Sequence, residues 1–253
     1  MLEFAVVTLA SSFAGFVDAI VGGGGLILVP ALFGAFPNAA PATLLGTNKA
    51  ASVWGTAWAS VQYARRVTLR WHALLPALAA ALAGGFAGAW CVTRIPSDGL
   101  RRALPFVLLG VLLYTLARKD LGRVHAPRYA GAREAWAAGT VGLAIGFYDG
   151  FFGPGTGSLL LFVFITFFGF DFLTAAAGAK VANVATNVSA VAYFVATDHV
   201  LYALALPMAL CNIAGSLTGA RLAMGKGRPY IRILFLAVLA ALIVKLALDM
   251  RRG

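Results

Sequence analysis

Long apolar runs separated by short polar segments make up most of this 253-residue chain. Most of these runs approach or exceed the roughly 20 residues that a helix needs to cross the hydrocarbon of a bilayer. Eight runs are distinguishable, at residues 4–33, 43–62, 73–93, 103–117, 135–169, 172–197, 200–224 and 231–248. The fourth run is short and is bounded by basic residues that can snorkel to the interface. The pattern predicts an all-α integral membrane protein.

Glycine-rich breaks interrupt the first and fifth runs, at residues 22–25 and 153–157. Glycine has little preference for the helix, and Pro154 removes a backbone donor, so each run is predicted to form two shorter helices. The second of these would begin near Leu26 or Ser158, with the Ser158 hydroxyl as a candidate cap. Unwound backbone at membrane depth persists only beside a hydrated cavity or inside protein, and a helix start that faces a cavity attracts anions. A tight kink that serves packing is the alternative.

The second half of the chain repeats landmarks of the first half at a constant offset of 131 residues. Asp149 corresponds to Asp18, and Lys180 corresponds to Lys49. Seven further pairs share the offset: Gly15/Gly146, Gly22/Gly153, Gly24/Gly155, Pro76/Pro207, Gly84/Gly215, Gly88/Gly219 and Arg101/Arg232. Aspartate and lysine are scarce here, so coincidence is a poor explanation. Internal duplication is typical of transporters, whose substrate site lies between the repeats.

The duplication divides the chain into two repeats of four runs each, at residues 1–117 and 135–253, joined by the polar linker 118–134. If all eight runs span the membrane, the repeats are parallel. If the broken first run of each half is re-entrant, each half crosses three times and the two halves are inverted. The inverted arrangement is preferred because it explains the glycine breaks. It predicts a periplasmic amino terminus and a cytoplasmic linker.

Composition supports a multi-pass membrane protein, with lipid as its surroundings. The chain is 61% hydrophobic and 11% charged, and its mean hydropathy is +0.87, so polar residues are too few to cover a soluble globule. The 20 basic residues outnumber the 9 acidic ones, but they fall mainly in short segments between apolar runs. Such placement follows the positive-inside rule and argues against nucleic acid as a partner. Cys91 and Cys211 lack metal-ligand or CxxC spacing, so no metal, cofactor or disulfide is predicted.

Charged residues inside apolar runs are costly and usually mark a transport path or a structural ion pair. Lys49, Ser52 and Thr56 share one helical face, as do Lys180, Asn183 and Asn187 at the same spacing. A lysine can hold an oxyanion while amides and hydroxyls complete its hydrogen bonds. The predicted anion site consists of Lys49, Lys180, Asn48, Ser52, Asn183, Asn187, Gly23, Gly24, Gly155 and Thr156.

Asp18 and Asp149 are predicted to be coupling carboxylates or ion-pair partners of the lysines. One interpretation pairs Asp18 with Lys49, and Asp149 with Lys180, only to hold the broken helices together. The other has the substrate displace the carboxylate, which would couple binding to a change of conformation. Both can hold at once.

Two further motifs, Gly84-x-x-x-Gly88 and Gly215-x-x-x-Gly219, carry no predicted chemistry. Small residues at this spacing allow two helix backbones to approach closely. We expect them to pack helices inside the protomer or across a homodimer.

Four segments carry a family resemblance: GFVDAIVGGGGLILVPAL, LGTNKAAS, GFYDGFFGPGTGSLLLF and AKVANVATN. They resemble the TauE/SafE family of membrane permeases, also called sulfite exporters, and the resemblance extends over essentially the whole chain. It implies a multi-pass carrier of the plasma membrane that moves sulfur-containing anions such as sulfite or organosulfonates. Lys49 departs from the pattern, because many members keep the lysine only in the second copy.

Other functions are less consistent with the sequence. An intramembrane hydrolase would need a nucleophile and a base, but His72, His125 and His199 lie in or beside polar segments, so an enzyme is not expected. An anion channel, a transporter of another small organic anion and a structural membrane protein remain as alternatives. The nucleotide-binding motif GxxxxGK[ST] is absent from the sequence. An anion leaving a cell gains about 2.3 kcal/mol per charge and 100 mV, so its export needs no ATP.

Overall fold

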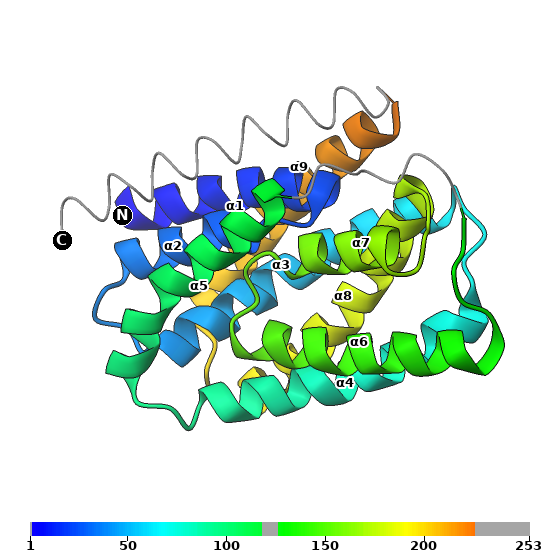
Figure 1. The fold of residues 1–253 in the computed structure, drawn as a ribbon. Coiled ribbons are helices and arrows are strands. Elements are labelled where there is room, and N and C mark those ends of the chain that lie inside the picture. Colours follow the sequence, from blue (N-terminus) through cyan, green and yellow to red (C-terminus); the bar gives the residue numbers. More distant parts are fainter. Residues whose placement is uncertain (1, 118–125, 226–253) are drawn as a thin grey trace.

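The computed structural model describes residues 2–117 and 126–225, and the regular secondary structure of these residues is entirely helical (Figure 1). The helices are α1 (Leu2–Val21), α2 (Gly25–Ala35), α3 (Pro41–Ala64), α4 (Trp71–Val92), α5 (Ser97–Ala117), α6 (Gly131–Phe151), α7 (Thr156–Thr166), α8 (Phe172–Ala196) and α9 (Tyr202–Gly225). The predicted all-α class is confirmed for this part of the chain.

Both glycine breaks are present. Gly22 ends α1 with a φ of +79°, and Gly153 and Gly155 separate α6 from α7 with φ values of +85° and +77°. Side chains disfavour this left-handed region, so glycine turns the chain here at little cost. The helices that follow, α2 and α7, have 11 residues each. At about 1.5 Å per residue they span roughly half of the hydrocarbon.

The other helices follow the predicted runs, with two exceptions. α5 begins at Ser97 and not at residue 103, because Arg101 and Arg102 belong to the helix. The Arg101 guanidinium donates a hydrogen bond to the carbonyl of Ala39 and lies 5.5 Å from the Phe33 ring centroid. α6 begins at Gly131, inside the predicted linker. Residues 118–125 of that linker and the predicted eighth run, 231–248, lie outside the described residues.

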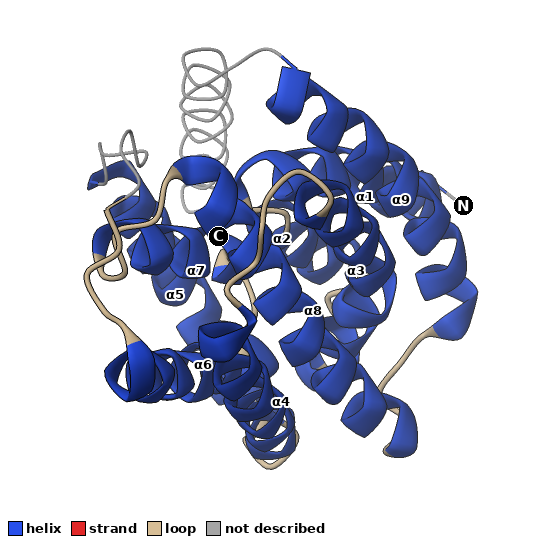
Figure 2. Ribbon diagram, turned by 90° about the vertical axis from the view of Figure 1, so that its right-hand side faces the viewer, coloured by secondary structure: helices blue, strands red, loops and turns tan. Residues whose placement is uncertain are grey.

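The helices before and after the linker interleave. α1 packs against α9, α4 packs against α6, and α3 and α8 lie between these two pairs (Figure 2). Figure 1 also shows that α1 and α6 run in opposite directions, as do α3 and α8. α2 and α7 begin 131 residues apart and end 131 residues apart.

The glycines of both Gly-x-x-x-Gly motifs face helices of the same chain. A Cβ atom on Gly84 or Gly88 would collide with α6 backbone, and one on Gly215 or Gly219 would collide with backbone of α1. The intramolecular alternative of the prediction is therefore the one that the structure shows. A homodimer stays a prediction, and these covered glycines are not available to form its interface.

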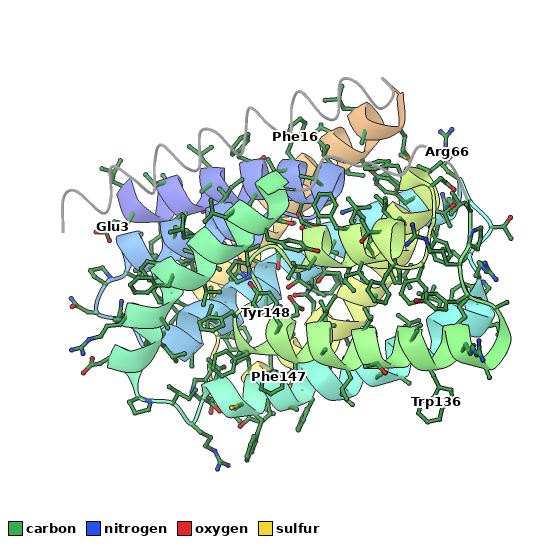
Figure 3. All side chains as sticks on the ribbon, viewed as in Figure 1. Glu3, Phe16, Arg66, Trp136, Phe147 and Tyr148 are labelled. Atoms are coloured by element: carbon green, nitrogen blue, oxygen red, sulfur yellow. The ribbon has the colours of Figure 1, made fainter. Side chains whose placement is uncertain are left out.

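Large apolar side chains cover much of the outer surface. Trp136 is 79% exposed and points away from the helices in Figure 3. Phe106, Leu206 and Leu210 are also largely exposed. Among the described helices, α1, residues 74–92 of α4 and α9 are long and apolar enough to cross a membrane. A surface this apolar is suited to lipid, so the chain is a membrane protein.

Candidate functional site

The two glycine breaks meet in the interior of the protein. The Ser158 N–H donates to the Gly22 carbonyl at 3.1 Å, and the Ser158 hydroxyl donates to the Val21 carbonyl at 2.7 Å. The prediction that Ser158 caps its own helix is therefore wrong, because Gly155 is the N-cap of α7. The hydroxyl instead donates to the Val21 carbonyl, which has no partner within α1 because the helix ends where the chain turns at Gly22. Residues more than 130 positions apart thus hold the two breaks together.

The buried lysines form ion pairs across the two halves. Lys49 Nζ lies 2.6 Å from Asp149 Oδ1. Lys180 Nζ lies 3.7 Å from Asp18 Oδ2 and also donates to the Asp18 carbonyl. Both lysines and Asp149 are almost completely buried, at 2%, 4% and 1% exposure. The predicted pairing within each half is wrong, because the interleaved halves place each carboxylate beside the lysine of the other half.

A small polar cavity lies where the breaks meet α3 and α8. Its volume is ≈ 30 Å³, which is room for one or two water molecules. Nine of the predicted site residues line it: Asp18, Gly24, Asn48, Lys49, Ser52, Asp149, Thr156, Asn183 and Asn187. Gly22, Gly25, Gly153 and Gly157 complete the contribution of the two breaks. Both glycine breaks therefore face one small polar cavity.

Three predicted residues are not brought into the cavity lining. Gly155 turns towards α5, where a Cβ atom would collide with Val111. Lys180 lies behind Asp18, with its ammonium 5.8 Å from the ring of Tyr63. Gly23 is buried beside the cavity without lining it. A part in binding for these three residues stays a prediction.

Hydrogen bonds organise most of the polar wall but leave two acceptors open. Thr56 Oγ1 donates to Asp18 Oδ2 at 3.2 Å, and Asn187 Nδ2 donates to Asn183 Oδ1 at 3.0 Å. Within the described part of the chain, Asn48 Oδ1 and Asp149 Oδ2 are buried and have no hydrogen-bond partner. Unpaired buried acceptors are costly, so this wall is suited to bind a water molecule, a proton or a polar ligand.

Sequence reasoning missed Asn212, which lines the cavity from α9. Its Nδ2 donates to the Ser11 carbonyl at 3.0 Å, and its Oδ1 lies against Gly55. The available signal was an amide in the middle of an apolar run, three residues before Gly215. That run was interpreted only as a packing helix.

A helical membrane protein with paired charges around a polar cavity has the features of a membrane transport protein, and the comparisons agree. Residues 7–246 match the family described as sulfite exporter TauE/SafE. A probable membrane transporter protein, ORF9, from Sinorhizobium sp. is 37% identical over 241 residues, which are 95% of this chain and 91% of the relative. The probable membrane transporter protein YfcA of Escherichia coli K12 is 34% identical over 98% of this chain and 91% of its own length. No solved structure matches significantly. The chain belongs to the TauE/SafE family of membrane transporters.

Proposed function

We propose that this protein is a secondary transporter that exports a small sulfur-containing anion, such as sulfite or an organosulfonate. The observation that carries the proposal is the position of Lys49. Its buried ammonium lines a cavity between two glycine breaks and is held by the carboxylate of Asp149. A buried cation held by a displaceable carboxylate is suited to take up an anion.

The helix starts around the cavity add further positive potential. α2 begins at Gly25 and α7 begins at Thr156, and both residues line the cavity. The first N–H groups of a helix lack partners within it, and the macrodipole favours negative charge at that end. Amides and hydroxyls from α3, α8 and α9 supply the remaining hydrogen bonds. The ligand is held by an ammonium, two helix ends and neutral polar groups.

Exchange of partners at Lys49 would couple binding to movement. An anion that takes the ammonium leaves Asp149 buried without its cation, which is unfavourable. The pair joins α3 of the first half to α6 of the second half, so its opening weakens a contact between the halves. Binding would therefore favour rearrangement of one half against the other, as alternating access requires.

We also propose that the two halves are inverted repeats in the plasma membrane, each with a re-entrant first segment. The opposite directions of α1 and α6, and the equal offset of α2 and α7, support this arrangement. The linker would be cytoplasmic and the amino terminus periplasmic. An inside-negative potential then drives anion export, by about 2.3 kcal/mol per charge and 100 mV.

The size of the cavity favours a carrier over a channel. At ≈ 30 Å³ it has space for one or two water molecules and not for a continuous file of hydrated ions. A carrier gives saturable flux and exchange between unlabelled and labelled substrate, whereas a channel gives neither.

Uptake of radiolabelled sulfite into proteoliposomes tests the proposal. Purified protein should give saturable uptake that a positive interior potential stimulates. Unlabelled sulfite inside the proteoliposomes should accelerate the uptake of labelled sulfite. Competition by sulfate, thiosulfate, sulfonates and carboxylates ranks the alternative substrates. Protein-dependent uptake of another organic anion without competition by sulfite would contradict the sulfur-anion assignment. Linear flux without exchange would support the channel.

A further inference from the structure

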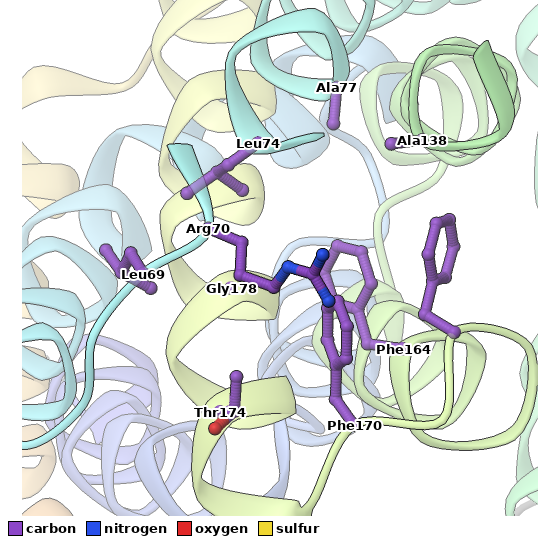
Figure 4. Close-up of a pocket in the computed structure, with 10 residues that line it drawn as sticks. Leu69, Arg70, Leu74, Ala77, Ala138, Phe164, Phe170, Thr174 and Gly178 are labelled. Carbon is purple, nitrogen blue, oxygen red and sulfur yellow. The ribbon is translucent and has the colours of Figure 1, made fainter. Parts of the chain in front are cut away.

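A third ion pair lies away from the central cavity, near the loop that joins α3 to α4. Arg70 Nη2 donates to Glu134 Oε2 at 2.9 Å, linking the start of α4 to the first turn of α6. The Arg70 side chain extends across a small pocket towards the rings of Phe164 and Phe170 (Figure 4). The guanidinium lies 5.8 Å from the Phe170 centroid. The pocket has a volume of ≈ 20 Å³.

The two partners of this pair differ in access. The Arg70 side chain is 36% exposed, whereas the Glu134 side chain is 2% exposed. Glu134 Oε1 is buried and has no hydrogen-bond partner within the described residues. A guanidinium has five N–H donors, and within the same residues Arg70 uses one of its donors, for Glu134. An oxyanion that forms a pair of parallel hydrogen bonds with the guanidinium can therefore replace the single hydrogen bond to Glu134.

The pocket and the central cavity lie along one seam between α7 and α8. The central cavity contacts Gly157 on α7 and Asn183 on α8, and the pocket contacts Phe164 and Gly178. Seven residues separate the contacts on α7, which corresponds to roughly 10 Å along a helix. Leu69 and Arg70 line the pocket, so it lies on the side of the 65–70 loop.

The surroundings of the pocket are mainly basic. Arg65 and Arg66 are exposed on the same loop, and the Arg128 guanidinium donates to the Thr166 carbonyl at the end of α7. Asp171, a carboxylate between α7 and α8, caps α8 through the N–H groups of Leu173 and Thr174. The local charge therefore attracts anions from the side that carries this loop.

The opposite end of the molecule is closed by different means. The position 131 residues from Arg70 is Leu201, whose N–H donates to Thr47 Oγ1 at 3.0 Å. In place of Ala77 and Ala138, the corresponding positions hold Met208 and Val7, both fully buried. The two ends therefore differ: Met208 and Val7 are packed without exposure at one end, whereas at the other end Ala77 and Ala138 line a pocket that the Arg70 side chain enters.

We propose that Arg70 is a second oxyanion site, at which an incoming small oxyanion displaces Glu134 and opens the path to the central cavity. The inference rests on the proposed function, because the ligand is the anion that the central site carries. Glu134 acts as a tethered competitor that occupies the guanidinium when no anion is present. Because the two ends differ in this way, the anion enters the transporter from the end that carries Arg70.

Four variants in proteoliposomes test the site, with sulfite as the probe. Arg70→Gln should raise the KM for sulfite by about tenfold, because it removes a charge-assisted contact. Arg70→Lys should raise the KM to a smaller extent, since lysine keeps the charge and loses the paired donors. Glu134→Gln should lower the KM severalfold, because the competing charge is gone. Arg66→Gln, which removes an exposed charge on the same loop but no contact of the proposed site, should raise the KM much less than Arg70→Gln.

Two results would overturn the inference. Equal increases in the KM for Arg70→Gln and Arg66→Gln would mean that Arg70 attracts anions only through its charge and does not bind them. Unchanged KM values with lowered melting temperatures in both Arg70→Gln and Glu134→Gln would make the pair a structural staple only. If the wild type moves no sulfite, the proposed function fails separately. The rise in melting temperature that sulfite or sulfate gives to the detergent-solubilised protein then decides the inference. If Arg70 binds the anion, this rise is lost in Arg70→Gln and kept in Lys49→Ala. Any other pattern overturns the inference.

Discussion

The ammonium of Lys49 lies 2.6 Å from the carboxylate of Asp149, a residue exactly one hundred positions further along the chain and in the other half of the molecule. Lys180 makes the corresponding contact with Asp18. The two pairs therefore bind the halves to each other and do not brace each half separately. Any movement that separates the halves at the cavity must open these pairs.

Stability of double variants tests the pairing across the halves. Lys49→Gln leaves Asp149 buried without a cation and should cost about 3–5 kcal/mol of stability, as breaking a buried pair does. Lys49→Gln combined with Asp149→Asn should recover most of that loss, because both charges are removed together. The matched control, Lys49→Gln with Asp18→Asn, should recover none and should be less stable than either single variant. Thermal melting in detergent compares the wild type with the single and double variants. Recovery of stability in the control would instead favour pairing within one half.

Transport by lysine variants and by the double variant separates the anion site from a structural role. Lys49→Ala and Lys180→Ala should reduce sulfite flux at least about tenfold while the protein still inserts into the membrane. The double variant of Lys49 and Asp149 should be stable and inactive, because it keeps the fold and lacks the cation. Flux assays on equal amounts of reconstituted protein give the comparison. Wild-type flux in the double variant would show that the charges serve only as staples.

The contact between the glycine breaks predicts a sharp difference between neighbouring positions. Gly22→Ala should prevent stable folding, because its Cβ atom would overlap the Gly157 backbone and its φ of +79° strains any side chain. Gly23→Ala is the matched control, since its Cβ atom would meet its nearest neighbours at an ordinary 3.8 Å. Folded yield by size-exclusion chromatography distinguishes the two variants. Equal yields would mean that the breaks do not touch as described.

Packing inside the protomer predicts the effect of enlarging the Gly-x-x-x-Gly positions. Gly84→Leu and Gly215→Leu should lower the melting temperature strongly, because each side chain would collide with backbone of α6 or α1. Gly110→Leu on α5 should be tolerated, as a Cβ atom there has no neighbour within 4 Å among the described residues. Melting curves and light scattering read stability and mass together. A change of oligomeric state at unchanged melting temperature would assign these glycines to a dimer interface.

Cysteine labelling tests the inverted arrangement. Glu3 and Arg66 lie at opposite ends of the molecule (Figure 3). In a variant whose Cys91 and Cys211 are replaced by serine, a cysteine at position 3 should react with a membrane-impermeant maleimide added to intact cells. A cysteine at position 66 should react only after the cells are opened. The reverse pattern, or labelling of both from one side, would reject the periplasmic amino terminus.

Hydrophobic patterning was sufficient to predict the secondary structure and the membrane class, because both depend on local composition. The runs of apolar residues gave α3, α4, α8 and α9 to within two residues at each end. The glycine breaks were readable because few residues adopt a left-handed turn without strain. The start of α5 was misplaced because charged residues at a helix end look like a boundary, whereas Arg101 can belong to the helix and still reach a carbonyl outside it.

The sequence by itself also identified most of the polar residues that line the cavity, since a charge or an amide in an apolar run needs a special environment. Only the tertiary structure decided which lysine pairs with which aspartate, where Ser158 donates its hydrogen bond and that Asn212 joins the site. Each of these depends on contacts between helices from different halves of the chain. Helical periodicity fixes which residues share a face, but it does not determine which distant face packs against it.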